Sequence, residues 1–247
     1  MGIEDAGSLP TKKTKGIIDM WSTNVVLHGK SGVGKTAMLA EFDNIFFIRT
    51  EDRHDHVDIF EKRVKNWGQF KKVVSALTKK CPYRTIAVDT LKNLYYWCQE
   101  YVCKKLEIEH ESDLKYGKGW NAVRLEFARY ITKLANVNAG VWFVAHTQMI
   151  TVENSLYKGD TFAVNLPTQP YDIVVPICNM TLFMGFDPDA EDEGGGAKRI
   201  MVCQPIDDIE AKDSYGVLPD IIKLGNNPKT AFKRMLKHFK SSAKKEK

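Results

Sequence analysis

The chain has 247 residues, 43% of them hydrophobic, and a formal net charge of +5, which is typical of a folded protein built mainly as one α/β domain with short extensions. Its longest apolar runs have the length of a strand, far below the roughly 20 residues that cross a bilayer, so we expect no membrane contact. The five cysteines show no C-x-x-C spacing, which argues against a zinc site or a disulfide framework and favours a reduced, cytoplasmic protein.

The first structured element is expected after residues 1–15, which are polar and lysine-containing and predict a flexible basic arm. An apolar strand, Val25–Leu27, then runs through His28 into a glycine-rich loop of the pattern G-x-x-x-x-G-K-[ST] and a helix. Glycines let backbone N–H groups close around phosphate oxygens, and the N-terminus of the following helix adds the positive end of its dipole. The pattern therefore predicts an ATP site, although a glycine-rich turn without a ligand is the alternative. The predicted nucleotide-binding residues are Gly29, Lys30, Ser31, Gly32, Val33, Gly34, Lys35 and Thr36.

Within this loop, two side chains have separate chemical roles. Lys35 is expected to reach the β- and γ-phosphates, and the hydroxyl of Thr36 is expected to hold Mg²⁺.

Two further apolar segments are expected to be buried strands that end in acids. Asn44–Arg49 is followed by Thr50 and Glu51, and Thr85–Val88 closes with Asp89. Four small or apolar residues closed by Asp match the Walker B pattern, whose carboxylate holds Mg²⁺ through water. Thr90, not Glu, follows Asp89, which disfavours ATPases with a water-activating Glu at that position.

Apolar residues at helical spacing predict helices over residues 67–79, over Leu91–Leu106 and from Trp120 to Leu134. Val141–Ala145 predicts a fourth buried strand, after which come His146, Thr147 and Gln148.

The pattern changes after Gln148. Residues 149–170 show no clear periodicity, and a connection of this length is usually functional or mobile. Met180–Phe186 and Arg199–Gln204 predict the strands of a hairpin. A basic helix follows, and residues 236–247 are expected to be a basic C-terminal tail. Basic ends suit a polyanion partner, although solubilising tails have the same composition.

Five short segments carry a resemblance to a known family: Gly29–Thr36, Thr50–Glu51, Val88–Thr90, Tyr116–Trp120 and Val144–His146. Through them the sequence resembles the RecA-like branch of P-loop ATPases. More narrowly, over roughly residues 22–215, it is similar to phage AAA-type nucleotide-binding proteins related to RecA-like single-strand-annealing ATPases. The resemblance implies an α/β fold, a RecA-like P-loop NTPase with a mostly parallel central sheet flanked by helices and a C-terminal β-hairpin extension. Residues 16–235 would form this ATPase domain.

The resemblance also implies roles for individual residues. Glu51 would polarise the attacking water, with a surface acid at a strand end as the alternative, and Gln148 would sense the γ-phosphate. Family members often carry Lys-x-Arg near the last strand, from which a neighbouring subunit could supply a finger. This sequence has Lys212-Asp213-Ser214, so Lys212 is the candidate finger, with Lys198 or Arg199 as alternatives.

The partners implied are single-stranded DNA and further copies of the chain, in the bacterial host cytoplasm if the protein is phage-encoded. We expect DNA to contact the segment after Gln148, where Tyr157 could stack on a base and Lys158 could bind a phosphate.

Two other classes of protein carry a glycine-rich loop of this pattern. A small-molecule or nucleoside kinase is the first alternative, but its lid should be rich in arginine and residues 149–170 contain none. A dimeric partitioning ATPase is the second, but Ser31 stands where its loop usually has glycine.

Overall fold

The computed structural model describes residues 18–51, 58–153, 158–190, 197–206 and 208–242. Within them, nine strands form one sheet in the order β11-β9-β8-β1-β5-β4-β2-β3, with β10 paired to β8. The neighbouring strands from β8 to β3 are parallel, and β9, β10 and β11 are joined to them by antiparallel pairing. The parallel strands are β1 Val25–His28, β2 Ile45–Arg49, β3 Phe60–Arg63, β4 Thr85–Asp89, β5 Gly140–Ala145 and β8 Met180–Phe186; the others are β9 Arg199–Val202, β10 Lys212–Asp213 and β11 Ile221–Gly225.

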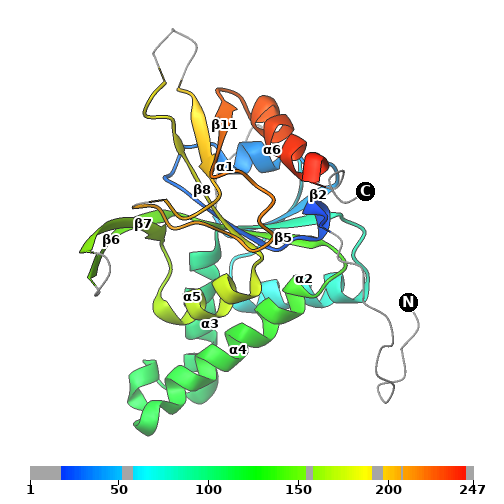
Figure 1. Ribbon diagram of the computed structural model, residues 1–247. Coiled ribbons are helices and arrows are strands. Elements are labelled where there is room, and N and C mark those ends of the chain that lie inside the picture. Colours follow the sequence, from blue (N-terminus) through cyan, green and yellow to red (C-terminus); the bar gives the residue numbers. More distant parts are fainter. Residues whose placement is uncertain (1–17, 52–57, 154–157, 191–196, 207, 243–247) are drawn as a thin grey trace, which may run out of the picture.

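Helices cover both faces of this sheet, as Figure 1 shows, with α2 to α5 on one side and α1 and α6 on the other. The predicted mixed α/β arrangement of a central sheet flanked by helices is therefore confirmed. The helices are α1 Lys35–Leu39, α2 Trp67–Lys79, α3 Leu91–Leu106, α4 Lys118–Ala135, α5 Thr168–Ile177 and α6 Pro228–Ser242, and short 3-10 turns occupy Met20–Ser22, Glu111–Asp113 and Lys115–Gly117. None of the helices in the described part of the chain is long and apolar enough to cross a bilayer.

The hydrophobic core lies in two layers, one on each face of the sheet. In β1, Val26 packs into the layer beneath α2 to α5, while Val25 and Leu27 pack into the layer beneath α1 and α6. A strand buried on both faces needs apolar residues at successive positions. This is why β1, β2, β4 and β5 were visible in the sequence as continuous apolar runs, and their predicted positions are confirmed.

The segment after β5 is more regular than the sequence indicates. Thr147–Glu153 (β6) and Lys158–Val164 (β7) pair antiparallel in a separate two-stranded sheet, which we call the ribbon. The ribbon projects from one side of the molecule (Figure 1). Side chains along β6 are largely exposed, and Met149 is 63% exposed, so the ribbon lacks the buried alternation that marks a strand in a sequence.

The C-terminal strands and helix are integrated into the sheet. β8 lies beside β1 in parallel and β9 pairs antiparallel with β8, so both strands predicted for a hairpin belong to the central sheet. α6 runs through the boundary expected at residue 235, and its residues Ala231, Met235 and Phe239 are buried against the core. The predicted arm, residues 1–15, and the last part of the predicted tail, residues 243–247, lie outside the described residues.

Gly119, in the Tyr116–Trp120 segment, has a packing explanation. A Cβ at Gly119 would collide with the backbone of Glu111, which packs against the start of α4. Glycine at this position therefore allows the loop before α4 to fold back onto the helix.

Candidate functional site

A cavity of about 200 Å³ lies where β1, β2, β4 and β5 end. Because these strands are parallel neighbours, their carboxyl ends meet at one edge of the sheet, the place where ligands of open α/β sheets bind. Segments far apart in the sequence therefore share one lining. The lining residues are Ser31, Gly32, Gly34, Lys35, Thr36, Ala37, Arg49, Glu51, Asp89, Thr90 and His146.

The predicted P-loop, Gly29–Thr36, follows β1 and supplies five of the eleven lining residues. Gly32 and Gly34 have φ angles of +79° and +100°, in the left-handed region that side chains with a Cβ rarely adopt. Gly29 meets a different constraint, because a Cβ there would collide with the carbonyl oxygen of Met184. Gly29, Lys30 and Val33 were predicted to bind the nucleotide but are not among the residues that line the cavity.

Lys35 is buried, and its Nζ donates hydrogen bonds to the carbonyl oxygens of Gly29 at 2.7 Å and Lys30 at 3.0 Å. These bonds hold the ammonium against the loop and beside the cavity. The helix that follows is short, since α1 spans only Lys35–Leu39. Few peptide dipoles add up in so short a helix, so the positive charge of Lys35 contributes more to the site than the helix dipole does.

Thr36 and Asp89 form a pair whose chemistry fits Mg²⁺. Oγ1 of Thr36 donates a hydrogen bond to Oδ2 of Asp89 at 2.7 Å. Burial raises the pKa of Asp89, although the bond from Thr36 and the charge of Arg49 act in the opposite direction. A divalent cation would offset the free-energy cost of burying the charged carboxylate of Asp89. Mg²⁺ prefers oxygen ligands and usually keeps several waters, so one hydroxyl and one carboxylate are a fitting protein share of its coordination.

Glu51 lies at the same edge, held by a bridge between the ends of β2 and β4. Oγ1 of Thr50 donates to the carbonyl oxygen of Thr90 at 2.8 Å, and the Thr90 N–H donates back to Oγ1 of Thr50 at 2.8 Å. Oγ1 of Thr90 donates to Oε1 of Glu51 at 3.0 Å. The carboxylate of Glu51 is thereby oriented within the lining of the cavity.

His146 takes the position that the sequence assigned to Gln148. It follows β5 directly, lines the cavity, and its Nε2 lies 3.7 Å from Oε1 of Glu51. Gln148 belongs to the ribbon instead: it pairs with Ala163 and its Nε2 donates to the carbonyl oxygen of Val164 at 3.4 Å. Gln148 is therefore not among the residues that line the cavity, because β6 begins at Thr147 and pairs with β7 in the ribbon.

Arg49 is a cavity residue that the sequence analysis did not single out. It is the last residue of β2, is only 2% exposed, and is paired in register with Asp89. Its Nη1 lies 3.9 Å from Oε2 of Glu61. The sequence did contain a signal for Arg49, because a charged residue ends an otherwise apolar run that predicts a buried strand.

Lys212 does not point outward as a finger should. Its Nζ donates to the carbonyl oxygens of Val175 at 3.2 Å and Cys178 at 2.8 Å, at the C-terminal end of α5. The ammonium of Lys212 is therefore bound within its own chain. Lys158 lies on the ribbon, exposed and 2.7 Å from Oε1 of Glu153, whereas Tyr157 lies outside the described residues.

Comparison with known families gives one match: a family model described as an AAA domain aligns with residues 22–215. Comparison with curated proteins gives no match. The matched range includes every residue that lines the cavity.

Proposed function

The chain belongs to the AAA domain family of P-loop ATPases, and from that premise we propose that it binds ATP with Mg²⁺, hydrolyses it, and acts as a RecA-like protein on single-stranded DNA in phage-type recombination or annealing. The observation that carries the enzymatic part is the meeting of Lys35, the Thr36–Asp89 pair and Glu51 in one cavity.

Each cavity residue has its own role in phosphoryl transfer. Lys35 and Arg49 supply positive charge where charge develops on the transferred phosphoryl group. When bound at Thr36 and Asp89, Mg²⁺ neutralises phosphate charge. Glu51 accepts a hydrogen bond from the attacking water and polarises it. His146, beside Glu51, replaces Gln148 as our candidate for the γ-phosphate sensor.

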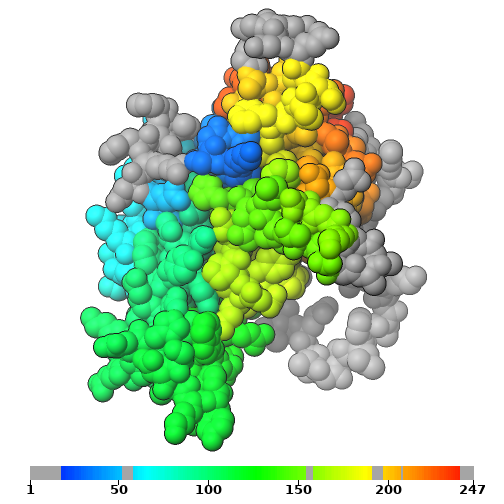
Figure 2. All heavy atoms as spheres, turned by 90° about the vertical axis from the view of Figure 1, so that its left-hand side faces the viewer, coloured from blue at the N-terminus to red at the C-terminus, as the bar shows by residue number. Residues whose placement is uncertain are grey.

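Contacts between the P-loop and the ribbon support a coupling of DNA to ATP. The ribbon begins one residue after His146. Nζ of Lys30 lies 5.9 Å from the ring centroid of Phe162 in β7, and Nδ1 of His28 lies 3.0 Å from Oγ1 of Thr147 in β6. Figure 2, seen from the side of the ribbon, shows the green ribbon next to the blue segment that holds the P-loop. DNA bound on the ribbon would therefore act on residues that touch the nucleotide loop.

The test is an ATPase assay on the purified chain, with and without Mg²⁺ and single-stranded DNA, and with Lys35→Ala as the control for contaminating activity. We expect turnover that requires Mg²⁺ and rises when DNA is added. A specific phosphate acceptor would favour the kinase alternative. Absence of DNA binding at low salt in the presence of ATP would remove the recombination role and leave the nucleotide site standing.

We also propose that the working form is a homo-oligomer. Arg49 already gives the cavity an arginine from its own chain, so the need for an arginine from a neighbouring subunit has to be measured. The measurement is specific ATPase activity against protein concentration, made beside light scattering with an ATP analogue and DNA. Activity that rises with concentration supports a site completed by a neighbour. Constant activity in a strict monomer excludes this proposal.

A further inference from the structure

Arg199 contacts the P-loop from a distant part of the chain. It is the first residue of β9, and its Nε donates a hydrogen bond of 2.6 Å to the carbonyl oxygen of Val33. The same guanidinium donates through Nη1 to the carbonyl oxygens of Ala197 at 3.2 Å and Asn226 at 2.8 Å. It also lies over the ring of Phe186, 5.7 Å from its centroid. The side chain is thus held by strands and loops that do not belong to the P-loop.

Through the carbonyl oxygen of Val33, Arg199 contacts the peptide unit that joins Val33 to Gly34 in the loop. Gly34 lines the cavity, whereas Val33 and Arg199 are not among the lining residues. A Cβ added to Gly34 would lie 3.3 Å from Nε of Arg199, so the guanidinium sits directly against this residue. Arg199 therefore touches the loop backbone without reaching the place where substrate would lie.

Peptide geometry connects this contact to phosphate binding. The Val33–Gly34 bond is trans, and in a planar trans peptide the C=O and the N–H point in opposite directions. Fixing the Val33 carbonyl toward Arg199 therefore fixes the Gly34 N–H away from Arg199.

Glycine alone would not hold this orientation. Gly34 has a φ of +100° and no Cβ, so rotation of the peptide meets little steric resistance. A hydrogen bond from a charged donor is stronger than one between neutral groups, and at 2.6 Å this one is short.

We propose that Arg199 is a positioning residue of the nucleotide site: it locks the Val33–Gly34 peptide so that the Gly34 N–H is presented to the phosphates. This inference rests on the proposed ATP site and adds to it a backbone orientation set from β9. Lys35 holds two other carbonyls of the same loop, those of Gly29 and Lys30. The loop is then fixed at both ends, by Lys35 from within and by Arg199 from the neighbouring strand.

The test compares affinities for Mg-ADP, measured by calorimetry on the full-length chain and its variants below their unfolding temperatures. Arg199→Ala should raise the Kd at least about tenfold, which is about 1.4 kcal/mol. Arg199→Lys, which keeps a charged donor, should recover part of that loss.

Arg234→Ala is the matched control, because Nη1 of Arg234 donates to the carbonyl oxygen of Lys223 at 3.0 Å, near Arg199 but away from the P-loop. As an exposed arginine, its removal should leave the Kd within about twofold. If Arg234→Ala loses as much affinity as Arg199→Ala, the effect comes from a general loss of packing around these two arginines, and the inference is overturned.

Other outcomes are also decisive. Equal Kd values for the unaltered chain and Arg199→Ala overturn the role of Arg199 alone, whereas no ADP binding by the unaltered chain overturns the proposed function with it. Should Arg199→Ala fail to fold, Arg199→Gln keeps a neutral donor and should give a Kd between those of Arg199→Lys and a chain lacking the P-loop lysine. A Kd equal to that of the unaltered chain would overturn the inference.

Discussion

The proposed function gives Lys35 a role in ATP binding and Glu51 a role in hydrolysis, so Lys35→Ala and Glu51→Gln should lose different properties. Lys35→Ala removes the ammonium that lies against the P-loop and should abolish tight ATP binding. Glu51→Gln keeps the shape of the side chain but loses the base, so ATP should still bind while turnover falls by about 10² or more, about 2.7 kcal/mol. Equilibrium binding and steady-state turnover, measured on both variants, separate the two effects. Near-normal turnover by Glu51→Gln would exclude Glu51 as the base.

His28, the last residue of β1, is buried, and its surroundings predict a contribution to stability that depends on pH. Its Nε2 lies 2.8 Å from the carbonyl oxygen of Glu210 and its Nδ1 lies 3.0 Å from Oγ1 of Thr147. Because a carbonyl can only accept, Nε2 donates to Glu210 and Nδ1 accepts from Thr147. Burial lowers the pKa of His28 from 6.5 to about 4, so the imidazole stays neutral in the folded protein.

The sign of the pH effect follows from this lowered pKa. Between pH 6.5 and about 4 the unfolded chain binds a proton at His28 and the folded chain does not. The free energy of unfolding should therefore fall as the pH drops through this window, by at most about 3 kcal/mol from this residue. His28→Gln keeps a donor and an acceptor but does not titrate. Denaturant unfolding of both proteins across the window should show a shallower fall for the variant, and identical pH profiles would contradict the assignment.

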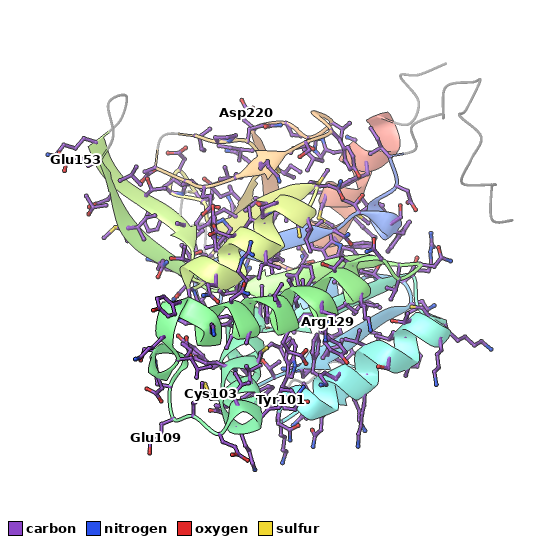
Figure 3. All side chains as sticks on the ribbon, turned by 90° about the horizontal axis from the view of Figure 1, so that it is seen from below. Tyr101, Cys103, Glu109, Arg129, Glu153 and Asp220 are labelled. Atoms are coloured by element: carbon purple, nitrogen blue, oxygen red, sulfur yellow. The ribbon has the colours of Figure 1, made fainter. Side chains whose placement is uncertain are left out.

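Among the elements, the ribbon is the one to which the proposed function assigns the contact between single-stranded DNA and the nucleotide loop. Its base touches His28 and Lys30, on either side of Gly29. Its outer end carries Lys158, and Figure 3 labels Glu153 there, far from the helices. Changes at the outer end should therefore affect DNA contact, while changes at the base should affect the P-loop.

Tyr157→Ala combined with Lys158→Ala should uncouple DNA from ATP. Stacking on an aromatic ring is worth about 1 to 3 kcal/mol per base, so loss of the pair should abolish DNA stimulation of turnover while basal hydrolysis continues. An ATPase titration with single-stranded DNA measures both quantities. Glu153→Ala is the matched control, because it removes only the exposed partner of Lys158, and such surface pairs contribute little. Full stimulation of the double variant would exclude these two residues as the contact.

For the molecule as a whole, the net charge of +5 favours a polyanion as partner, and eight of the 36 lysines and arginines lie in and after α6. Residues 240–247 contain four lysines, Lys240, Lys244, Lys245 and Lys247. Each phosphate contact on a single strand contributes about −0.7 to the log-log salt slope of binding. Deleting residues 240–247 should weaken DNA binding and flatten this slope by up to about 3, with DNA stimulation of turnover retained.

Fluorescence anisotropy across a salt series measures that slope. Replacing the four lysines by alanine keeps the chain length and should reproduce the deletion. If the deletion leaves the slope unchanged, the tail makes no contact with the DNA backbone.

Features that are encoded locally could be predicted from the sequence. The P-loop pattern, the apolar strands buried on both faces and the acids Glu51 and Asp89 at strand ends depend on neighbouring residues and on periodicity, and each lies in the structure at the predicted place along the chain. The Thr36–Asp89 pair also followed, since the loop and Walker B patterns imply a shared Mg²⁺.

The tertiary structure alone decided which side chains meet. Residues 33 and 199 touch although 166 positions separate them, and no local pattern encodes that distance. His146 lines the cavity and Gln148, two positions later, lies in the ribbon, because the direction of the chain after β5 depends on the pairing of β6 with β7. Two carbonyls at the end of α5 bind the ammonium of Lys212, a contact that the sequence around Lys212 does not indicate. Motifs indicate which chemical groups a chain contains. Only the tertiary packing decides which of these groups lie next to one another.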